Sequence, residues 1–289
     1  MKQPLSPFVP CLTAFHLKLL AVTFMLIDHI GCFLLDRNTD IYIICRSWGR
    51  LAFPIFCFLI AEGARHTHSL PQYMARLAAF AFISTPPFNL VHGERWYAFD
   101  HLNVFFTLFF GLAAVAAVKE LSPRILRRLG KVSLSQNEFV CALLALPVCA
   151  ALYWTAYALN TDYGGYGVAA ILIFWLLRNL PAAAWGSFAL ITFIGQDWYF
   201  VGRGFTGLNE IISCNPYDMI AHRVWERNYT LKFFNSRQML APLALFPCLL
   251  YNGQKGGSVK RSAFVKYAFY SFYPLHLTAI WLVQLFTVK

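Results

Sequence analysis

Long apolar stretches separated by short polar segments make up most of the chain from about residue 12 onward. A membrane-spanning helix needs about 20 mainly apolar residues. Several of the stretches are short or carry charge, so eight to ten spans fit the pattern, and about nine is our prediction. The sequence therefore predicts an all-α, polytopic transmembrane helix bundle. The nine candidate spans cover residues 12–35, 48–64, 72–91, 101–118, 139–159, 164–178, 183–201, 236–251 and 264–286.

The composition supports a membrane protein. Of the 289 residues, 58% are hydrophobic and 13% are charged, whereas a soluble domain averages about 45–50% and about 25%. The net charge of +11 resides mostly in short segments between apolar runs. That placement indicates membrane topology rather than nucleic-acid binding. Because no long polar block could fold outside the bundle, we expect a single integral membrane domain over residues 1–289.

The charged segments predict the sidedness of the spans, because cytoplasmic loops collect Lys and Arg. Residues 119–138 and 252–263 are basic and should be cytoplasmic, whereas residues 160–163 carry only Asp162. An uncleaved first helix is expected, since no small-residue cleavage site follows a short apolar core. The alternation of spans places the N-terminus and residues 65–71 inside, and residues 36–47, 202–235 and the C-terminus outside.

Cysteine and histidine spacing gives little sign of a metal site. The eight cysteines show no CxxC spacing and lie mostly in apolar runs, so we interpret them as small buried side chains. His66 and His68 form a lone HxH pattern, which is more typical of a polar loop than of a metal centre. We therefore predict no metal.

Ionisable residues inside the first span are the main functional signal. A charge in the hydrocarbon region costs about 2.5–3.5 kcal/mol or more, so its presence points to a function. The stretch LKLLAVTFMLIDHIG contains Lys18, Asp28 and His29. Lys18 and His29 are eleven residues apart, within about 20° of three full helical turns, so they share one helix face about 16 Å apart.

The second span, WGRLAFPIFCFLIAEG, brings further charges to the same two levels. Arg50 should lie at the same depth in the membrane as Asp28 and His29, and Glu62 should lie near the depth of Lys18. One interpretation is two buried ion pairs that hold the hairpin together. The other is functional, because a histidine beside an acid can exchange a proton near pH 7.

The last span contains FYSFYPLHLTAIW, which places His276 near the depth of His29. A hydrogen-bonded core histidine and a second proton carrier both fit this position. Pro274 should kink the helix and free a backbone carbonyl. In the third span, Pro86 and Pro87 are expected to break the helix at an outer rim.

Weaker polar positions complete the pattern. His101 and Asn103 open the fourth span, and Asp162 in DYGGYG is expected to hold a tight glycine turn rather than to bind a ligand. A cluster of basic residues at the cytoplasmic side, which we call the basic mouth, could bind the phosphates of a nucleotide-like cofactor. Its charge could equally result from the preference of cytoplasmic loops for Lys and Arg. Its members are Lys18, Arg65, His66 and Arg76.

Seven ordered stretches resemble the TraX family of membrane proteins. They are LKLLAVTFMLIDHIG, GRLAFPIFCFLIAEG, RLAAFAFISTPPFNL, NVFFTLFFG, DYGGYGV, YNGQKG and FYPLHL. The resemblance implies N-terminal acetylation of conjugative pilin at the bacterial inner membrane, with acetyl-CoA as donor. Many family members lie outside conjugation systems, so it does not define the acceptor.

A second, more distant resemblance is to the membrane acyltransferase-3 superfamily. Its first span carries a basic residue, ten residues and then a histidine, which Lys18 and His29 match. This resemblance implies that His29 is the catalytic histidine. The long polar segment 202–235 does not map cleanly onto the ten-helix bundle of that superfamily.

Together these features predict a multi-pass acetyltransferase that moves acetyl from cytoplasmic acetyl-CoA to an amine, such as a pilin N-terminus, or to a hydroxyl. A proton-coupled transporter and a non-catalytic pilus assembly scaffold are the alternatives. Adjacent helical residues point about 100° apart, so Asp28 should pair with Arg50 rather than orient His29. Arg50 could instead stabilise the oxyanion. The candidate catalytic residues are His29, Asp28, Arg50 and His276, and the candidate donor-binding residues are Lys18, Glu62, Arg65 and Arg76.

Overall fold

The structure, a computed structural model, describes residues 10–192, 237–256 and 263–287, and all regular elements in these ranges are helical. This confirms the predicted all-α class for the described part of the chain. The elements are α1 (Ala14–Leu34), α2 (Asp40–Gly49), α3 (Ala52–His66), α4 (Leu70–Val91), α5 (Val104–Ala116), η1 (Ala117–Leu121), α6 (Ser122–Arg128), α7 (Val132–Ser135), α8 (Glu138–Ala158), α9 (Gly164–Leu176), a helix over residues 181–192, η2 (Arg237–Ala244), α14 (Leu245–Leu249) and α15 (Ala263–Thr287).

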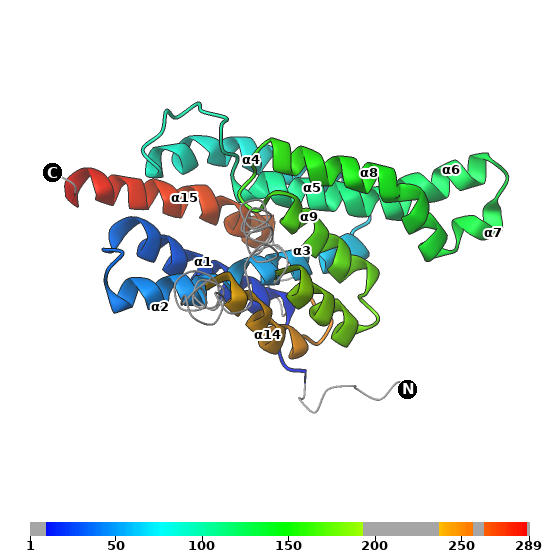
Figure 1. Ribbon diagram of the computed structural model, residues 1–289, viewed down its shortest axis with the longest axis horizontal. Coiled ribbons are helices and arrows are strands. Elements are labelled where there is room, and N and C mark those ends of the chain that lie inside the picture. The colour runs from blue at the N-terminus through cyan, green and yellow to red at the C-terminus, as the bar shows by residue number, and fades with distance from the viewer. Residues whose placement is uncertain (1–9, 193–236, 257–262, 288–289) are drawn as a thin grey trace, which may run out of the picture.

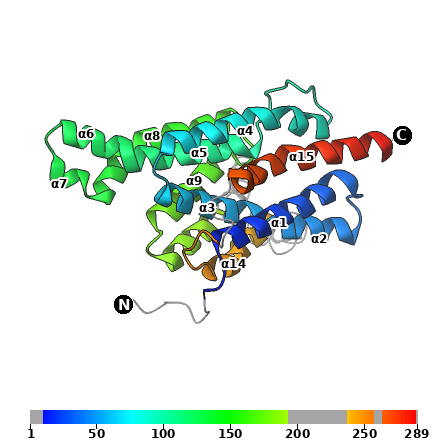
Figure 2. The same cartoon turned by 180° about the vertical axis from the view of Figure 1, so that it is seen from behind.

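The long helices run roughly along the long axis of the molecule (Figure 1). α15 packs against α4 and α1, and α5 packs against α4, α8 and α9. The α1–α2 turn, the α4–α5 connection and the end of α15 lie at one end, and α6 and α7 lie at the opposite end, which Figure 2 shows from behind. Which end faces the cytoplasm stays a prediction.

Four helical stretches among the described residues are long and apolar enough to cross a membrane: Ala14–Leu34, Asp40–His66, Val104–Arg128 and Glu138–Ala158. Gly164–Leu176 and Leu240–Leu249 are shorter apolar helices. The predicted count of nine spans is therefore not confirmed. The predicted outer segment 202–235 lies outside the described residues.

Residues 36–47 are not the outer loop that the sequence predicted. α2 covers most of this segment, and the connection after α1 is short. The Thr39 side chain accepts a hydrogen bond from the Tyr42 backbone N–H, which caps the helix. Asp40 and Arg46 lower the hydropathy of this segment and so concealed a helix that continues almost directly into α3.

The predicted break at Pro86 and Pro87 is also wrong, because α4 continues through both prolines to Val91. Each proline removes one backbone hydrogen bond of the helix, and side chains on both sides of the pair join α4 to the segment that follows it. Asn103 donates to the Ala81 carbonyl (2.8 Å) on the near side of the prolines. On the far side, the Asn89 side chain donates to the carbonyl of Ala98 (2.7 Å).

Candidate functional site

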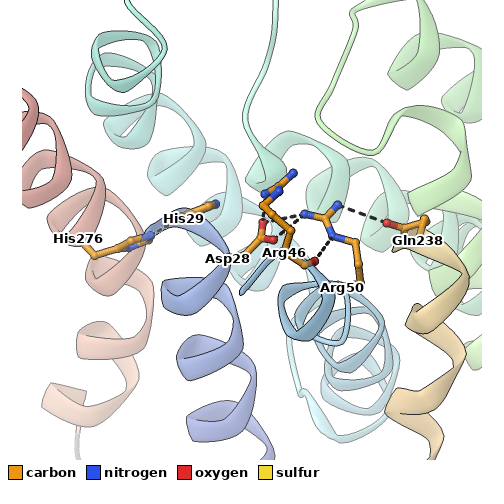
Figure 3. Close-up of polar contacts among 6 residues, drawn as sticks. All are labelled: Asp28, His29, Arg46, Arg50, Gln238 and His276. Atoms are coloured by element: carbon orange, nitrogen blue, oxygen red, sulfur yellow. Dashed lines mark hydrogen bonds and ion pairs between the residues drawn. The ribbon is translucent and has the colours of Figure 1, made fainter. Parts of the chain in front are cut away.

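Asp28 lies at the centre of a buried ion-pair cluster between α1 and α2. Its carboxylate accepts hydrogen bonds from Arg46 Nη1 (2.6 Å) and from Arg50 Nη2 (2.8 and 2.7 Å). Arg50 also donates to the Arg46 carbonyl (3.2 Å) and to Gln238 Oε1 in η2 (3.4 Å), as Figure 3 shows. The predicted Asp28–Arg50 pair is confirmed. Arg46 was missed because its segment had been assigned to a loop.

Gly49 allows α2 to approach this cluster so closely. A Cβ added at Gly49 would collide with the Asp28 side chain. Only a residue without a Cβ fits here unless one helix moves away from the other. The position of Gly49 in the SWGR sequence therefore determines how the two guanidinium groups reach Asp28.

His29 contacts His276 rather than Asp28, and Figure 3 shows the two sequence neighbours directed to different sides of α1. His29 Nδ1 lies 2.6 Å from His276 Nε2, and the two rings are nearly coplanar, at 7°. The predicted match in depth between the two histidines is confirmed as a direct contact. The carbonyl partner of His276 is Phe272, with Nδ1 at 2.7 Å.

This arrangement determines where the protons lie. A carbonyl oxygen only accepts, so His276 Nδ1 must carry the proton of its bond to Phe272. In the neutral ring His276 Nε2 is then an acceptor, and His29 Nδ1 must donate to it. His29 Nε2 is left with a free lone pair, and it has no hydrogen-bond partner within the described residues.

His29 and the Asp28 cluster line a cavity of about 490 Å³ that we call the histidine cavity. It lies between α1, α2, the end of α4 and the start of α9. Apart from Arg50 and Asp162, sequence reasoning missed the polar residues of this wall that are far from His29 along the chain. The lining residues are Asp28, His29, Cys32, Phe33, Arg46, Arg50, Phe88, His92, Asp162, Tyr163, Tyr166 and Gln238.

A second cavity of about 380 Å³, which we call the basic cavity, lies beside the first half of α1. Lys18 is on its wall, with Nζ 5.7 Å from the centre of the Phe269 ring. Of the predicted basic mouth, Arg65 does not line the cavity and is half-exposed. Sequence reasoning missed two lysines that the end of the chain brings to this wall. The basic lining residues are Lys18, His66, Arg76, Lys255 and Lys266.

Glu62 lies on the wall of the basic cavity but is not paired with Lys18, which corrects the second predicted ion pair. Its carboxylate lies 2.8 Å from His66 Nε2, 3.5 Å from Tyr251 Oη and 3.7 Å from Arg65 Nη1. His66 and Arg65 follow Glu62 by four and three residues on the same helix, so they reach it more easily than Lys18 does. Lys18 has no ion pair among the described residues.

One face of α1 joins the two cavities. Lys18, Val22 and Met25 line the basic cavity, and His29 continues the same stripe into the histidine cavity. Tyr273 lines the basic cavity, and its ring centre is 6.0 Å from that of His29 and 5.6 Å from that of His276. The predicted shared face of Lys18 and His29 is confirmed.

The chain matches a known protein family over most of its length. The family model described as TraX protein matches residues 14–284. The chain belongs to the TraX family. The matched range includes Lys18, Asp28, His29, Arg50 and His276.

A named relative covers nearly the whole of this TraX-family chain. It is the probable fimbrial assembly protein FimC, serogroup H1, of Dichelobacter nodosus, which is 24% identical over 277 residues. The match covers 95% of this chain and 96% of the relative. No solved structure matches. Membership in the family therefore rests on sequence, and the site geometry rests on the structure described above.

Proposed function

We propose that this chain is a membrane acetyltransferase that moves acetyl from cytoplasmic acetyl-CoA to an amine or hydroxyl. The observation that carries the proposal is the chain of contacts from the Phe272 carbonyl through His276 to His29 Nδ1, which leaves His29 Nε2 as an acceptor. The bond from His29 Nδ1 to His276 orients the ring, and the same α1 face leads to the basic cavity. TraX-family membership and the fimbrial assembly relative support a pilus-related role with a pilin as acceptor.

The basic cavity suits the donor. Acetyl-CoA is a polyanion, and Lys18, Arg76, Lys255 and Lys266 supply cationic groups for its phosphates. Arg76 Nε is buried without a hydrogen-bond partner among the described residues. From Lys18, the thioester would have to reach about 16 Å along α1 to His29.

His29 then removes a proton from the acceptor. A protonated amine gives one proton to His29 Nε2 and becomes nucleophilic. Its nitrogen attacks the thioester carbonyl, the C–N bond forms and the C–S bond breaks. The thiolate leaves and takes up the second amine proton. An alternative route passes the acetyl group briefly through His29 Nε2, which the same lone pair allows.

Asp28 and Arg50 serve this site by positioning. The Arg50 guanidinium already donates hydrogen bonds to the Asp28 carboxylate, the Arg46 carbonyl and Gln238 Oε1. A group with its donors committed in this way is poorly placed to stabilise an oxyanion as well. The contacts therefore favour the ion-pair interpretation of Arg50, with His29 as the reacting group.

Transfer of labelled acetyl from acetyl-CoA in membranes containing the full chain tests the proposal. We expect His29→Ala to lower turnover at least about 100-fold, as for loss of a general base. His68→Ala is the matched control, because His68 is exposed and does not line either cavity. Normal turnover by folded, inserted His29→Ala protein would disprove the role of His29.

A further inference from the structure

The histidine cavity contains two carboxylates in very different surroundings. Asp28 is buried and bonded to two guanidinium groups. Asp162 is exposed on the cavity wall, and its carboxylate makes no hydrogen bond or ion pair with any described residue. We propose that Asp162 binds the positively charged amine of the acceptor, which rests on the proposed function and assigns this residue within it.

The turn that contains Asp162 does not use its side chain. The Asp162 backbone N–H donates to the Leu102 carbonyl (2.8 Å), and the Leu102 N–H donates to the Asn160 carbonyl (3.1 Å). Thr107 Oγ1 donates to Thr161 Oγ1 (2.9 Å). Backbone and neighbouring side chains thus hold the turn, so the predicted turn role does not account for a carboxylate at this position.

The segment after Asp162 is equally well fixed. The Tyr163 backbone N–H donates to Thr107 Oγ1 (3.3 Å), and the Tyr163 ring stacks on Phe53 with ring centres 3.4 Å apart. A Cβ added at Gly167 would collide with Thr107, so close packing of α9 depends on this glycine. The backbone at Asp162 is therefore fixed, and it places the side chain on the wall of the histidine cavity.

The Asp162 carboxylate has no ion-pair partner among the described residues of the histidine cavity. Arg46 and Arg50 both pair with Asp28, and neither forms an ion pair with Asp162. An ammonium group in the cavity could approach the Asp162 carboxylate directly and make a charge-assisted hydrogen bond with it.

The position of Asp162 also suits the chemistry at His29. Both side chains line the histidine cavity, so an amine held by Asp162 is in the same space as His29 Nε2. Asp162 holds the acceptor while it is protonated, and His29 removes the proton that blocks attack. A hydroxyl acceptor carries no positive charge and gains much less from this carboxylate.

A matched pair of probes tests the proposal by direct binding in the absence of acetyl-CoA. One probe is an apolar 20-residue peptide with a free N-terminal glycine, and the other carries glycolic acid in place of that glycine. The full chain in lipid nanodiscs is compared as wild type, Asp162→Asn and Asp162→Glu. Asp100→Asn is the control, because Asp100 is exposed, does not line the cavity and uses only its backbone carbonyl, in a bond from Asn160.

We expect Asp162→Asn to weaken binding of the amine probe by about 10-fold or more, as for loss of a charged hydrogen bond. Binding of the hydroxyl probe should change less than about twofold, and Asp162→Glu should retain most of the amine affinity. If Asp162→Asn does not fold, the wild type and Asp162→Glu decide the point. The proposal is supported if both proteins bind the amine probe more tightly than the hydroxyl probe. It is overturned if the wild type binds the two probes equally well.

Other outcomes separate this proposal from the proposed function. The role of Asp162 is overturned if Asp162→Asn loses affinity for both probes equally, or if its affinity for the amine probe is unchanged. It is also overturned if the wild type does not bind the amine probe. If the wild type binds the amine probe through Asp162 but transfers no labelled acetyl to it, the binding role stands and acetyl transfer is contradicted.

Discussion

Asp28 and His29 are neighbours in the sequence but belong to different parts of the site. The 100° turn per residue of a helix sends Asp28 toward the two arginines of the second span and His29 toward α15. Sequence reasoning predicted this separation and the Asp28–Arg50 pair. It did not predict the proton arrangement at His29, which depends on the Phe272 carbonyl in α15.

Replacing Asp28 should destabilise the protein strongly. Asp28→Asn leaves Arg46 and Arg50 without their anion in a buried site, so we expect a loss of about 3–5 kcal/mol. Glu120→Gln is the control, because its pair with Arg124 is exposed and worth less than about 1 kcal/mol. Thermal unfolding in detergent measures both, and equal shifts would contradict the assigned roles.

His276 should act through His29 rather than on the substrate. Without an acceptor for its Nδ1 proton, His29 loses its fixed orientation, and we expect His276→Ala to lower kcat at least about tenfold. His276→Gln keeps a side-chain oxygen that can accept this proton and should retain more activity. Measurement of kcat in both variants decides the point, since equal losses would indicate packing alone.

At the scale of elements, the pattern of long apolar stretches predicted the helical class and the approximate positions of most helices. It failed at α2, because Asp40 and Arg46 look like loop residues until the fold brings Arg46 to Asp28. It failed again at Pro86 and Pro87, because α4 continues through both residues. The error at α2 arises because a partner that is distant in the sequence, Asp28, decides whether Arg46 is tolerated in the buried part of a helix.

The approach of α1 and α2 should depend on Gly49. We expect Gly49→Ala to push Asp28 away from its arginines and to cost about 1–3 kcal/mol, as for an overpacked interior site. Gly186→Ala is the matched control, because a Cβ there meets no atom within 4 Å. Unfolding midpoints of the two variants test this, and a tolerated Gly49→Ala would show that the helices can separate at little cost.

At the scale of the whole molecule, the site consists of two cavities along one face of α1. The spacing of Lys18 and His29 predicted this face, and Arg76 and Glu62 line the predicted inner cavity. Lys255 and Lys266 could not be placed there from sequence, because the fold brings residues near the end of the chain back to α1. The Leu12 N–H, for example, donates to the Leu250 carbonyl (2.8 Å) beside this cavity.

The most direct test of the account is the shift in the unfolding temperature of the purified full chain on addition of acetyl-CoA. A ligand that binds only the folded state stabilises it by an amount that grows with the logarithm of one plus the ratio of the free ligand concentration to Kd. We predict a rise in melting temperature that increases with acetyl-CoA and is much smaller in the Lys18→Ala/Lys255→Ala double variant. Lys131→Ala, an exposed lysine outside both cavities, should respond like the wild type. A melting temperature that does not change with acetyl-CoA would contradict the acetyltransferase and favour a transporter or an assembly scaffold.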